Sequence, residues 1–136
     1  MDLSAFDTAE TANSGAVMEL RDPAGAPAIQ DDGSPITITL LGEDSDTIVK
    51  LQNRQTNRAL RAPGNQGISA EVSRANVIER LVAATVAWNG IVLDGEPLKC
   101  TPENAKAVYT RFGFIRDQAA LFITERGNFL KASPTS

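Results

Sequence analysis

The pattern of residues 16–41 is typical of short β-strands separated by tight turns. Ile36, Ile38 and Leu40 alternate with two threonines, so their side chains fall on one face of an extended strand. Asp-Pro-Ala-Gly at positions 22–25 has the residue preferences of a type I turn. Together these features predict a two- or three-stranded meander with candidate strands at residues 17–21, 27–30 and 36–40. Such a small antiparallel meander is marginal alone and must pack its apolar face on helices.

The rest of the chain has the apolar spacing and the capping residues of α-helices. Asp44 or Ser45, Ser69 and Thr101 are good N-cap residues, and Pro102 after Thr101 suits the first helical position. The predicted helices cover residues 45–61, 69–88, 101–112 and 115–126. Between the second and third, Asp94-Gly95 predicts a tiny hairpin or an extended loop over residues 91–98.

These elements predict an α+β fold in which a small N-terminal antiparallel β meander packs on three to four α-helices. We expect a single globular domain over residues 16–130, because the chain length suits one domain. Residues 1–15 are mostly polar and are predicted to form a flexible acidic arm with one turn of helix after Asp7. Residues 131–136 are predicted to be a polar tail.

Composition removes several classes of chemistry. Among 136 residues there is no histidine, so a Ser–His or Cys–His nucleophile pair cannot be built. The single cysteine, Cys100, has no partner for an internal disulfide. No acidic segment has the ligand spacing of a calcium loop, and no glycine-rich segment has a phosphate-binding pattern. We therefore expect no catalytic residue, no metal site, no cofactor and no enzymatic activity.

Charge is divided unevenly along the chain. Residues 1–47 contain ten acidic residues and one arginine, a net charge of −9, whereas residues 48–136 contain twelve basic and seven acidic residues, a net charge of +5. A negative end that meets a positive face favours head-to-tail self-association. The alternative is that both surfaces are simply solvated.

Four of the basic residues are spaced as one stripe of a helix. They are Lys50, Arg54, Arg58 and Arg61. Side chains at this spacing lie on one face, where like charges repel unless a partner or an acidic segment neutralises them. A nucleic acid is an unlikely partner, because the isoelectric point is about 4.8 and no aromatic stacking residues are interleaved with the stripe. A solvated helix face is the other interpretation.

The last two predicted helices contain most of the aromatic side chains, and these are the second candidate binding surface. They are Tyr109, Phe112, Phe114 and Phe122. An apolar face of this kind can bind an apolar partner helix. Each of these residues can equally belong to an ordinary core.

The order of local motifs along residues 17–130 resembles the small tail assembly chaperones of long-tailed bacteriophages. The resemblance rests on three segments, residues 17–61, 83–98 and 101–130, and it covers about 110 residues. Its main motifs are Trp-Asn-Gly at 88–90, Pro-Glu-Asn-Ala at 102–105, Asp-Gln at 117–118 and Arg-Gly-Asn-Phe-Leu at 126–130.

This resemblance implies a non-enzymatic factor that acts in the host cytoplasm. Such a factor coats the apolar, helical tape-measure protein and helps to recruit tail-tube subunits. It implies no catalytic residue. Two alternatives stay open: a structural virion component of the phage tail or neck, and a small nucleic-acid-binding regulator. No apolar run approaches 18 residues, so no membrane segment is expected.

Overall fold

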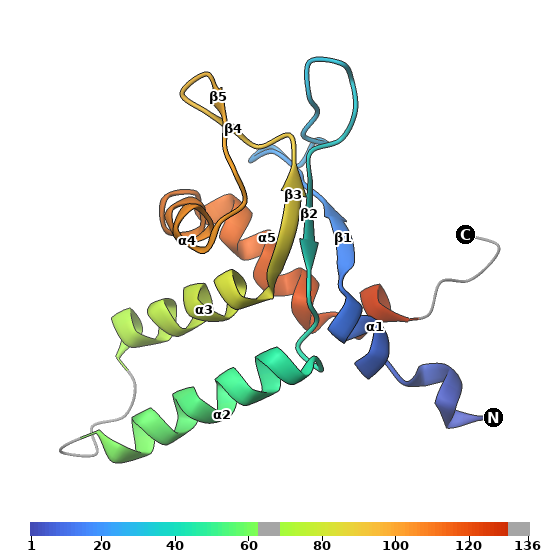
Figure 1. Cartoon of the computed structure of the whole chain (residues 1–136), viewed down its shortest axis with the longest axis vertical. Coiled ribbons are helices and arrows are strands. Elements are labelled where there is room, and N and C mark those ends of the chain that lie inside the picture. Colours follow the sequence, from blue (N-terminus) through green and yellow to red (C-terminus); the bar gives the residue numbers. More distant parts are fainter. Residues whose placement is uncertain (63–68, 131–136) are drawn as a thin grey trace.

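A three-stranded antiparallel sheet and the helices around it form an α+β fold (Figure 1), which confirms the predicted fold class. This computed structural model describes residues 1–62 and 69–130 of the chain. The strands are β1 (Ala16–Glu19), β2 (Thr37–Leu40), β3 (Thr85–Asn89), β4 (Val92–Leu93) and β5 (Glu96–Pro97). The α-helices are α1 (Ala9–Ser14), α2 (Asp46–Arg61), α3 (Ala70–Ala84), α4 (Pro102–Arg111) and α5 (Gly113–Thr124), with 3-10 turns η1 (Leu3–Phe6) and η3 (Arg126–Phe129).

The main sheet has the order β1-β2-β3, with β2 in the centre and antiparallel to both neighbours. Met18, Ile38 and Trp88 stand side by side in register across the three strands and pack into the core. On the opposite face of the sheet, Val17 is 60% exposed. The alternation predicted for the second of these strands is therefore real, and Ile38 and Leu40 are fully buried.

The third strand of this sheet is not the one that the sequence predicts. Residues 27–30 make only two isolated bridges, Arg21 with Pro27 and Ile29 with Pro35, and form no regular strand. The place of a third strand is taken by β3, which pairs with β2 from about 50 residues further along the chain. The candidate strand at 27–30 was therefore wrong, because this segment joins a long loop instead of the sheet, whereas the other two candidate strands pair as β1 and β2.

The prediction was also wrong that the second long helix continues to Trp88. Helix α3 ends at Ala84, and β3 begins at the next residue. The hydroxyl of Thr85 donates to the carbonyl of Leu81 at 2.6 Å, and the carbonyl of Ala84 accepts from the backbone N–H of Leu41 at 2.8 Å. Thr, Val and Trp all favour extended structure, so pairing with β2 overrides the helical apolar spacing of these residues.

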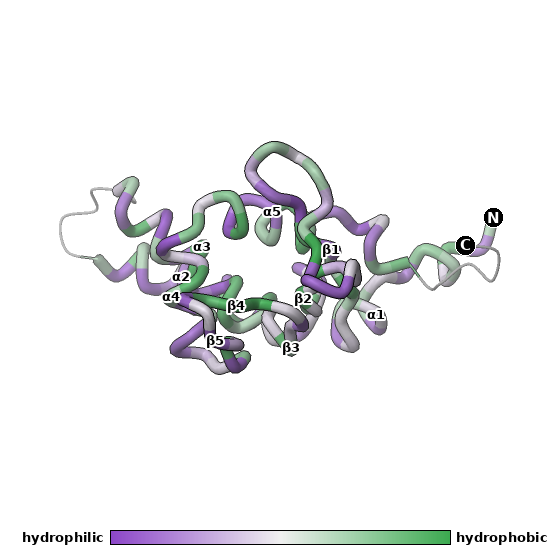
Figure 2. Tube along the Cα trace, turned by 90° about the horizontal axis from the view of Figure 1, so that it is seen from above, coloured by the Kyte–Doolittle hydropathy of each residue, from purple (hydrophilic) through white to green (hydrophobic). Residues whose placement is uncertain are grey.

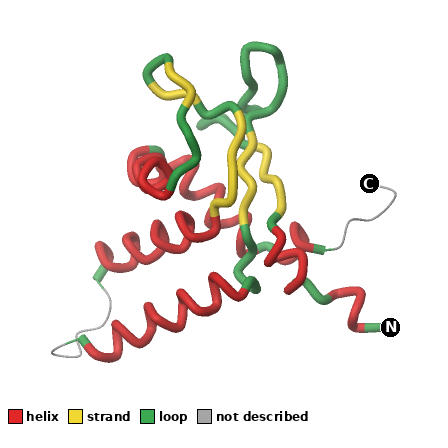
Figure 3. The backbone as a smooth tube through the Cα atoms, viewed as in Figure 1, coloured by secondary structure: helices red, strands yellow, loops and turns green. Residues whose placement is uncertain are grey.

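Local capping explains where the helices start. Ser45, Ser69 and Thr101 each accept a hydrogen bond from the backbone N–H three residues later. Helices α2 and α3 then lie next to each other, whereas α4 and α5 pack against α3 (Figure 3). The predicted hairpin at 91–98 is confirmed, with β4 antiparallel to β5.

The core lies between the sheet and helices α3, α4 and α5, with the first half of α2 at its lower edge. Its largest fully buried side chains include Tyr109, Leu81 and Ile48. Burial of each large side chain contributes on the order of 1.5–3 kcal/mol. This core fixes the relative positions of the helices that carry the candidate site.

The segment predicted as an arm contains a short helix that packs on the domain. Ala12 of α1 is buried, and its carbonyl accepts from the backbone N–H of Gly42 at 3.1 Å. A Cβ at Gly42 would come within 2.9 Å of the Ala12 Cβ, so glycine permits this close approach. Before α1, Leu3 and Phe6 are exposed. The predicted tail, 131–136, lies outside the described residues.

None of the helices in the two described ranges is long and apolar enough to cross a membrane.

Candidate partner-binding site

An open apolar hollow of about 200 Å³ lies where the β1–β2 loop and the β4–β5 hairpin meet the junction of α4 and α5. We call it the apolar hollow. The loop and the hairpin project from the same end of the molecule (Figure 3). The side chains that line it include Leu20, Ile36, Ile91, Leu98, Phe112 and Phe114. Its volume is below the roughly 300–1,000 Å³ of small-molecule sites. The apolar hollow is therefore suited to one large apolar side chain of a partner.

The break between α4 and α5 positions the two phenylalanines. Phe112 ends α4 and begins α5, with φ −108° and ψ 88°. Its ring contacts the ring of Phe114 edge to face, with centroids 6.3 Å apart. Arg116 donates to the carbonyl of Tyr109 at 2.8 Å across the break. These contacts hold both rings at the wall of the apolar hollow.

Glycine at position 90 lets the two loops around the hollow meet. Gly90 has φ +90°, and a Cβ there would lie 2.5 Å from Cδ of Gln30. The Gln30 side chain also donates to the carbonyl of Pro35 at 3.2 Å. Below the hairpin, the indole N–H of Trp88 donates to the carbonyl of Leu98 at 2.7 Å. These contacts hold the two walls of the hollow, one from the β1–β2 loop and one from the residues after β3, in place next to the sheet.

The four aromatic residues predicted as a binding surface do not lie together. Phe112 and Phe114 both line the apolar hollow and are half-buried. Tyr109 is fully buried, and its hydroxyl is 2.7 Å from the hydroxyl of Thr85. Burial raises the pKa of the Tyr109 phenol to about 12. Phe122 lies further along α5, where its ring packs on Phe129 with centroids 5.7 Å apart.

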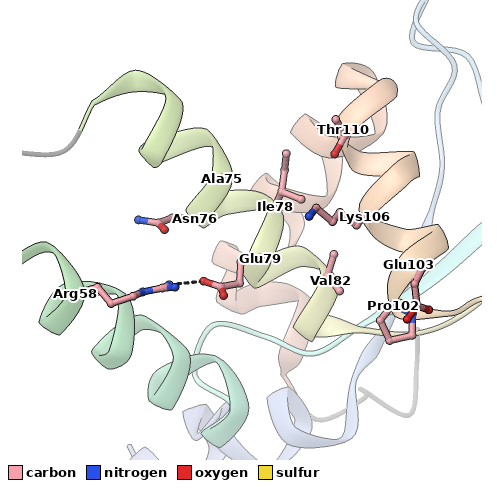
Figure 4. A pocket seen from close by; sticks show the side chains of 10 residues that line it. All are labelled: Arg58, Ala75, Asn76, Ile78, Glu79, Val82, Pro102, Glu103, Lys106 and Thr110. Carbon is pink, nitrogen blue, oxygen red and sulfur yellow. Dashed lines mark hydrogen bonds and ion pairs between the residues drawn. The ribbon is translucent and has the colours of Figure 1, made fainter.

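A second, wider groove of about 570 Å³ lies between α3 and α4 (Figure 4). We call it the helix groove. Ile78 and Val82 of α3 and Pro102 at the start of α4 give it apolar walls. Lys106 of α4 and the Arg58–Glu79 ion pair are also among its lining groups. Apolar walls with charged side chains beside them are typical of grooves that bind an amphipathic helix.

Part of the predicted basic stripe surrounds a third hollow, at the C-terminal half of α2. Arg54, Arg58 and Arg61 line it together with Asn57 and Glu79, and its volume is about 290 Å³. We call it the basic hollow. Lys50, the first residue of the stripe, is not among its lining residues. Three guanidinium groups against one carboxylate make this surface attractive to a partner's acidic groups.

Gln55 holds the Glu79 carboxylate in place in the basic hollow, and no sequence pattern indicates this role. Its side chain is buried and donates to the carbonyl of Asn76 and to the carboxylate of Glu79, both at 2.9 Å. The Gln55 oxygen accepts from Arg80 at 2.8 Å. The hydrogen bond from Gln55 and then the Arg58 guanidinium lower the pKa of the Glu79 carboxyl. A glutamine within a polar helix is ordinarily exposed, so no local pattern distinguishes Gln55 from its neighbours.

Other reactive groups in the described ranges are dispersed. No group of three or more cysteine or acidic side chains in these ranges is placed to hold a metal ion. Cys100 is partly buried, and burial raises the pKa of its thiol. A thiol with a raised pKa is a weak nucleophile near neutral pH.

Comparisons with known proteins give no match: no protein-family model, no curated protein and no solved structure is similar to this chain.

Proposed function

We propose that this chain is a tail assembly chaperone of a long-tailed bacteriophage, which acts in the host cytoplasm without enzymatic chemistry. Its main partner is then the apolar, helical tape-measure protein, and tail-tube subunits are recruited to that complex. The observation that carries this proposal is the apolar hollow, together with the family motifs described above. Two of the residues that line it, Phe112 and Phe114, belong to the aromatic set singled out from the sequence.

The arrangement of the two apolar concavities supports binding of a helix. The apolar hollow takes single large side chains, and the helix groove between α3 and α4 offers apolar walls with charged groups beside them. A chaperone that must leave before assembly ends needs contacts of limited area, because interfaces below about 1,200 Å² are typically weak and transient. Both concavities are open, with volumes of about 570 and 200 Å³.

The proposal is tested by co-expression with the product of the longest apolar, helical reading frame encoded just downstream. We expect that protein, insoluble alone, to become soluble and to co-purify with this chain. A partner that stays insoluble beside the wild-type chain would contradict the chaperone function. The next candidate would then be a virion component, and the finished particle would be searched for this chain.

Two exposed valines on strands offer a matched pair of variants for this experiment. Val92 lines the apolar hollow and is 58% exposed, whereas Val86 of β3 is 54% exposed and lies outside that lining. We expect Val92→Glu to lose the partner and Val86→Glu to retain it, because only the first places a charge where an apolar side chain must enter. Equal loss in both variants would argue against this hollow as the binding site.

The nucleic-acid alternative depends on the basic stripe, and a direct assay decides it. Glu79 lies among the three arginines of the basic hollow and opposes a polyanion there. We expect no measurable DNA affinity at low salt. Strong binding that Arg54→Glu with Arg58→Glu abolishes would favour a regulator instead.

A further inference from the structure

The N-terminal segment, residues 2–7, exposes both large apolar side chains and carboxylates. Leu3 is 72% exposed and Phe6 is 55% exposed, although both are large and apolar. Asp2 and Asp7 lie beside them and accept hydrogen bonds from the backbone N–H groups of Ser4 and Ala9. Neither carboxylate takes part in an ion pair with another described residue. Among the described residues, the segment is thus an acidic, apolar surface whose Asp2 and Asp7 form no ion pair.

The C-terminal half of α2 has the complementary character. Its basic hollow presents the three guanidinium groups of Arg54, Arg58 and Arg61. One residue before Arg61, the side chain of Leu60 is 74% exposed. Single exposed leucines are common, but Leu60 lies next to a group of three arginines. Within the hollow, Glu79 is the one acidic side chain among the lining residues. An acidic segment with apolar side chains matches this surface in both charge and hydrophobicity.

The two surfaces lie at opposite ends of the molecule. Thr8, just after the N-terminal segment, donates to Asp44 at the start of α2, whereas the basic hollow belongs to the other end of that helix. The sixteen residues of α2 span about 24 Å. Figure 2 shows the N-terminus at one end of the molecule and helices α2, α3 and α4 at the other. The hollow of one chain is therefore placed to receive a segment from a second chain.

We propose that the basic hollow of one copy binds the N-terminal segment of a second copy, so that the copies assemble head to tail. This contact is heterologous: each added copy brings a new free hollow or a new free segment, and the assembly closes into a ring or extends as a filament. The segment is short, so a single contact is small and reversible. Its attraction is electrostatic and weakens as salt screens the charges. The inference does not depend on the proposed function, because the apolar hollow that carries that function takes no part in it; the helix groove shares only Arg58 and Glu79 with the basic hollow, and neither is changed in the variants below.

Charge reversal in the full-length chain tests the contact. One variant combines Asp2→Lys with Asp7→Lys, and the other combines Arg54→Glu with Arg61→Glu. At about 20 mM salt, sedimentation should show that each variant associates on the order of tenfold more weakly than wild type. A mixture of the two variants should associate again, because the basic segment of one then meets the acidic hollow of the other.

Control variants with the same change in net charge at other positions distinguish an effect of this contact from an effect of net charge. Asp31→Lys with Glu96→Lys alters the net charge as the segment variant does, and Lys99→Glu with Lys106→Glu matches the hollow variant; all four residues are exposed. Both controls should associate as wild type does. Leu3→Ser with Phe6→Ser should weaken association at unchanged charge, because it removes the apolar part of the contact.

Three results would overturn the proposal. They are a monomeric wild type at high concentration and low salt, failure of the two reversed variants to associate when mixed, and loss of association in the controls. Thermal unfolding of every variant checks that it is folded. Asp2→Asn with Asp7→Asn keeps the acceptors for Ser4 and Ala9, so it should weaken association even if the lysine variant fails to fold.

Discussion

The side-chain amide of Gln118 bonds both backbone groups of Arg21, a residue 97 positions earlier in the chain. Its oxygen accepts from the Arg21 N–H and its nitrogen donates to the Arg21 carbonyl, each at 2.8 Å. The same nitrogen donates to the carbonyl of Phe114 at 3.0 Å. Arg21 lies just beyond β1, so one side chain of α5 takes the place of a neighbouring strand there. The amide therefore ties α5 and the wall of the apolar hollow to the sheet.

Replacement of this amide is expected to destabilise the fold. In Gln118→Leu both backbone groups of Arg21 lose their partner, which should lower the free energy of unfolding by about 1–3 kcal/mol. Urea denaturation measures the change. Asp117→Ala at the exposed neighbouring position is the control and should change stability by less than about 0.5 kcal/mol. An unchanged midpoint for Gln118→Leu would mean that water replaces the amide at no cost.

The buried Tyr109 hydroxyl gives a second prediction. Tyr109→Phe removes the hydrogen bond to Thr85 and should cost about 0.5–1.5 kcal/mol, and Thr85→Val in the same background should then cost less than it does alone. Double-mutant unfolding measures the coupling. Additive losses would indicate that the two hydroxyls do not interact in solution.

The same residue predicts a loss of stability in alkali. Burial raises the pKa of the Tyr109 phenol from 10.0 to about 12, so the folded chain holds its proton where the unfolded chain releases it. The stability contributed by the neutral phenol is complete below pH 10.0 and is lost as pH rises toward about 12. Because the chain contains one tyrosine, absorbance titration follows this group alone. Titration at the ordinary value would show that the ring is accessible to solvent.

For Asp44 we predict the opposite pH dependence of stability, with a loss of stability in acid. Hydrogen bonds from Arg126 and then from Thr8 lower the pKa of the Asp44 carboxyl below its ordinary 3.8. The Arg126 Nε lies 2.7 Å from one carboxylate oxygen, which also accepts from Thr8 at 2.6 Å. The resulting stability is present above pH 3.8 and is lost as pH falls through the lowered pKa in the folded chain.

Unfolding of Asp44→Asn as a function of pH tests this dependence. The asparagine variant should be less stable than wild type near neutral pH, and the difference should shrink as the medium becomes more acidic. Asp31→Asn, in an exposed turn, is the control and should follow wild type. A constant difference at every pH would mean that the charge of Asp44 contributes nothing and that only packing is lost.

We predict that the hydrogen bonds of Gln55 stabilise the packing of α2 on α3. Gln55→Ala leaves the Asn76 carbonyl, the Glu79 carboxylate and the Arg80 guanidinium each without one partner, which should cost about 1–3 kcal/mol. Hydrogen exchange should accelerate in Asp46–Arg61 more than in the sheet. Asn53→Ala, exposed on the same helix, should leave both measurements unchanged. Uniform acceleration across the chain would argue against a local role.

The helix starts and the tight hairpin could be predicted because they depend on neighbours in the sequence. Ser45, Ser69 and Thr101 cap helices through bonds that reach three residues along the chain. Asp94-Gly95 turns β4 back onto β5 in the same local way. The alternation of apolar residues and threonines at positions 36–40 likewise predicts the apolar face of β2 without reference to its partner strands.

The site could be predicted only in part. Phe112 and Phe114 belong to the aromatic set predicted as a binding surface, and they line the apolar hollow. Its opposite wall comes from Leu20 and Leu98, which no local pattern associates with them. Tyr109 had the same helical spacing as Phe112, yet it points into the core. Helical spacing gives the direction of a side chain relative to its own helix but not what covers that face.

The α+β class, the caps and the separation of acidic from basic residues follow from the order of amino acids alone, since each is set by local preference or simple composition. Three other outcomes are visible only in the folded chain: residues 85–89 form β3, residues 27–30 form no strand, and Gln55 and Gln118 are structural. These outcomes depend on partners far along the chain. Pairing with β2 supplies the backbone hydrogen bonds that outweigh the helical preference of residues 85–89.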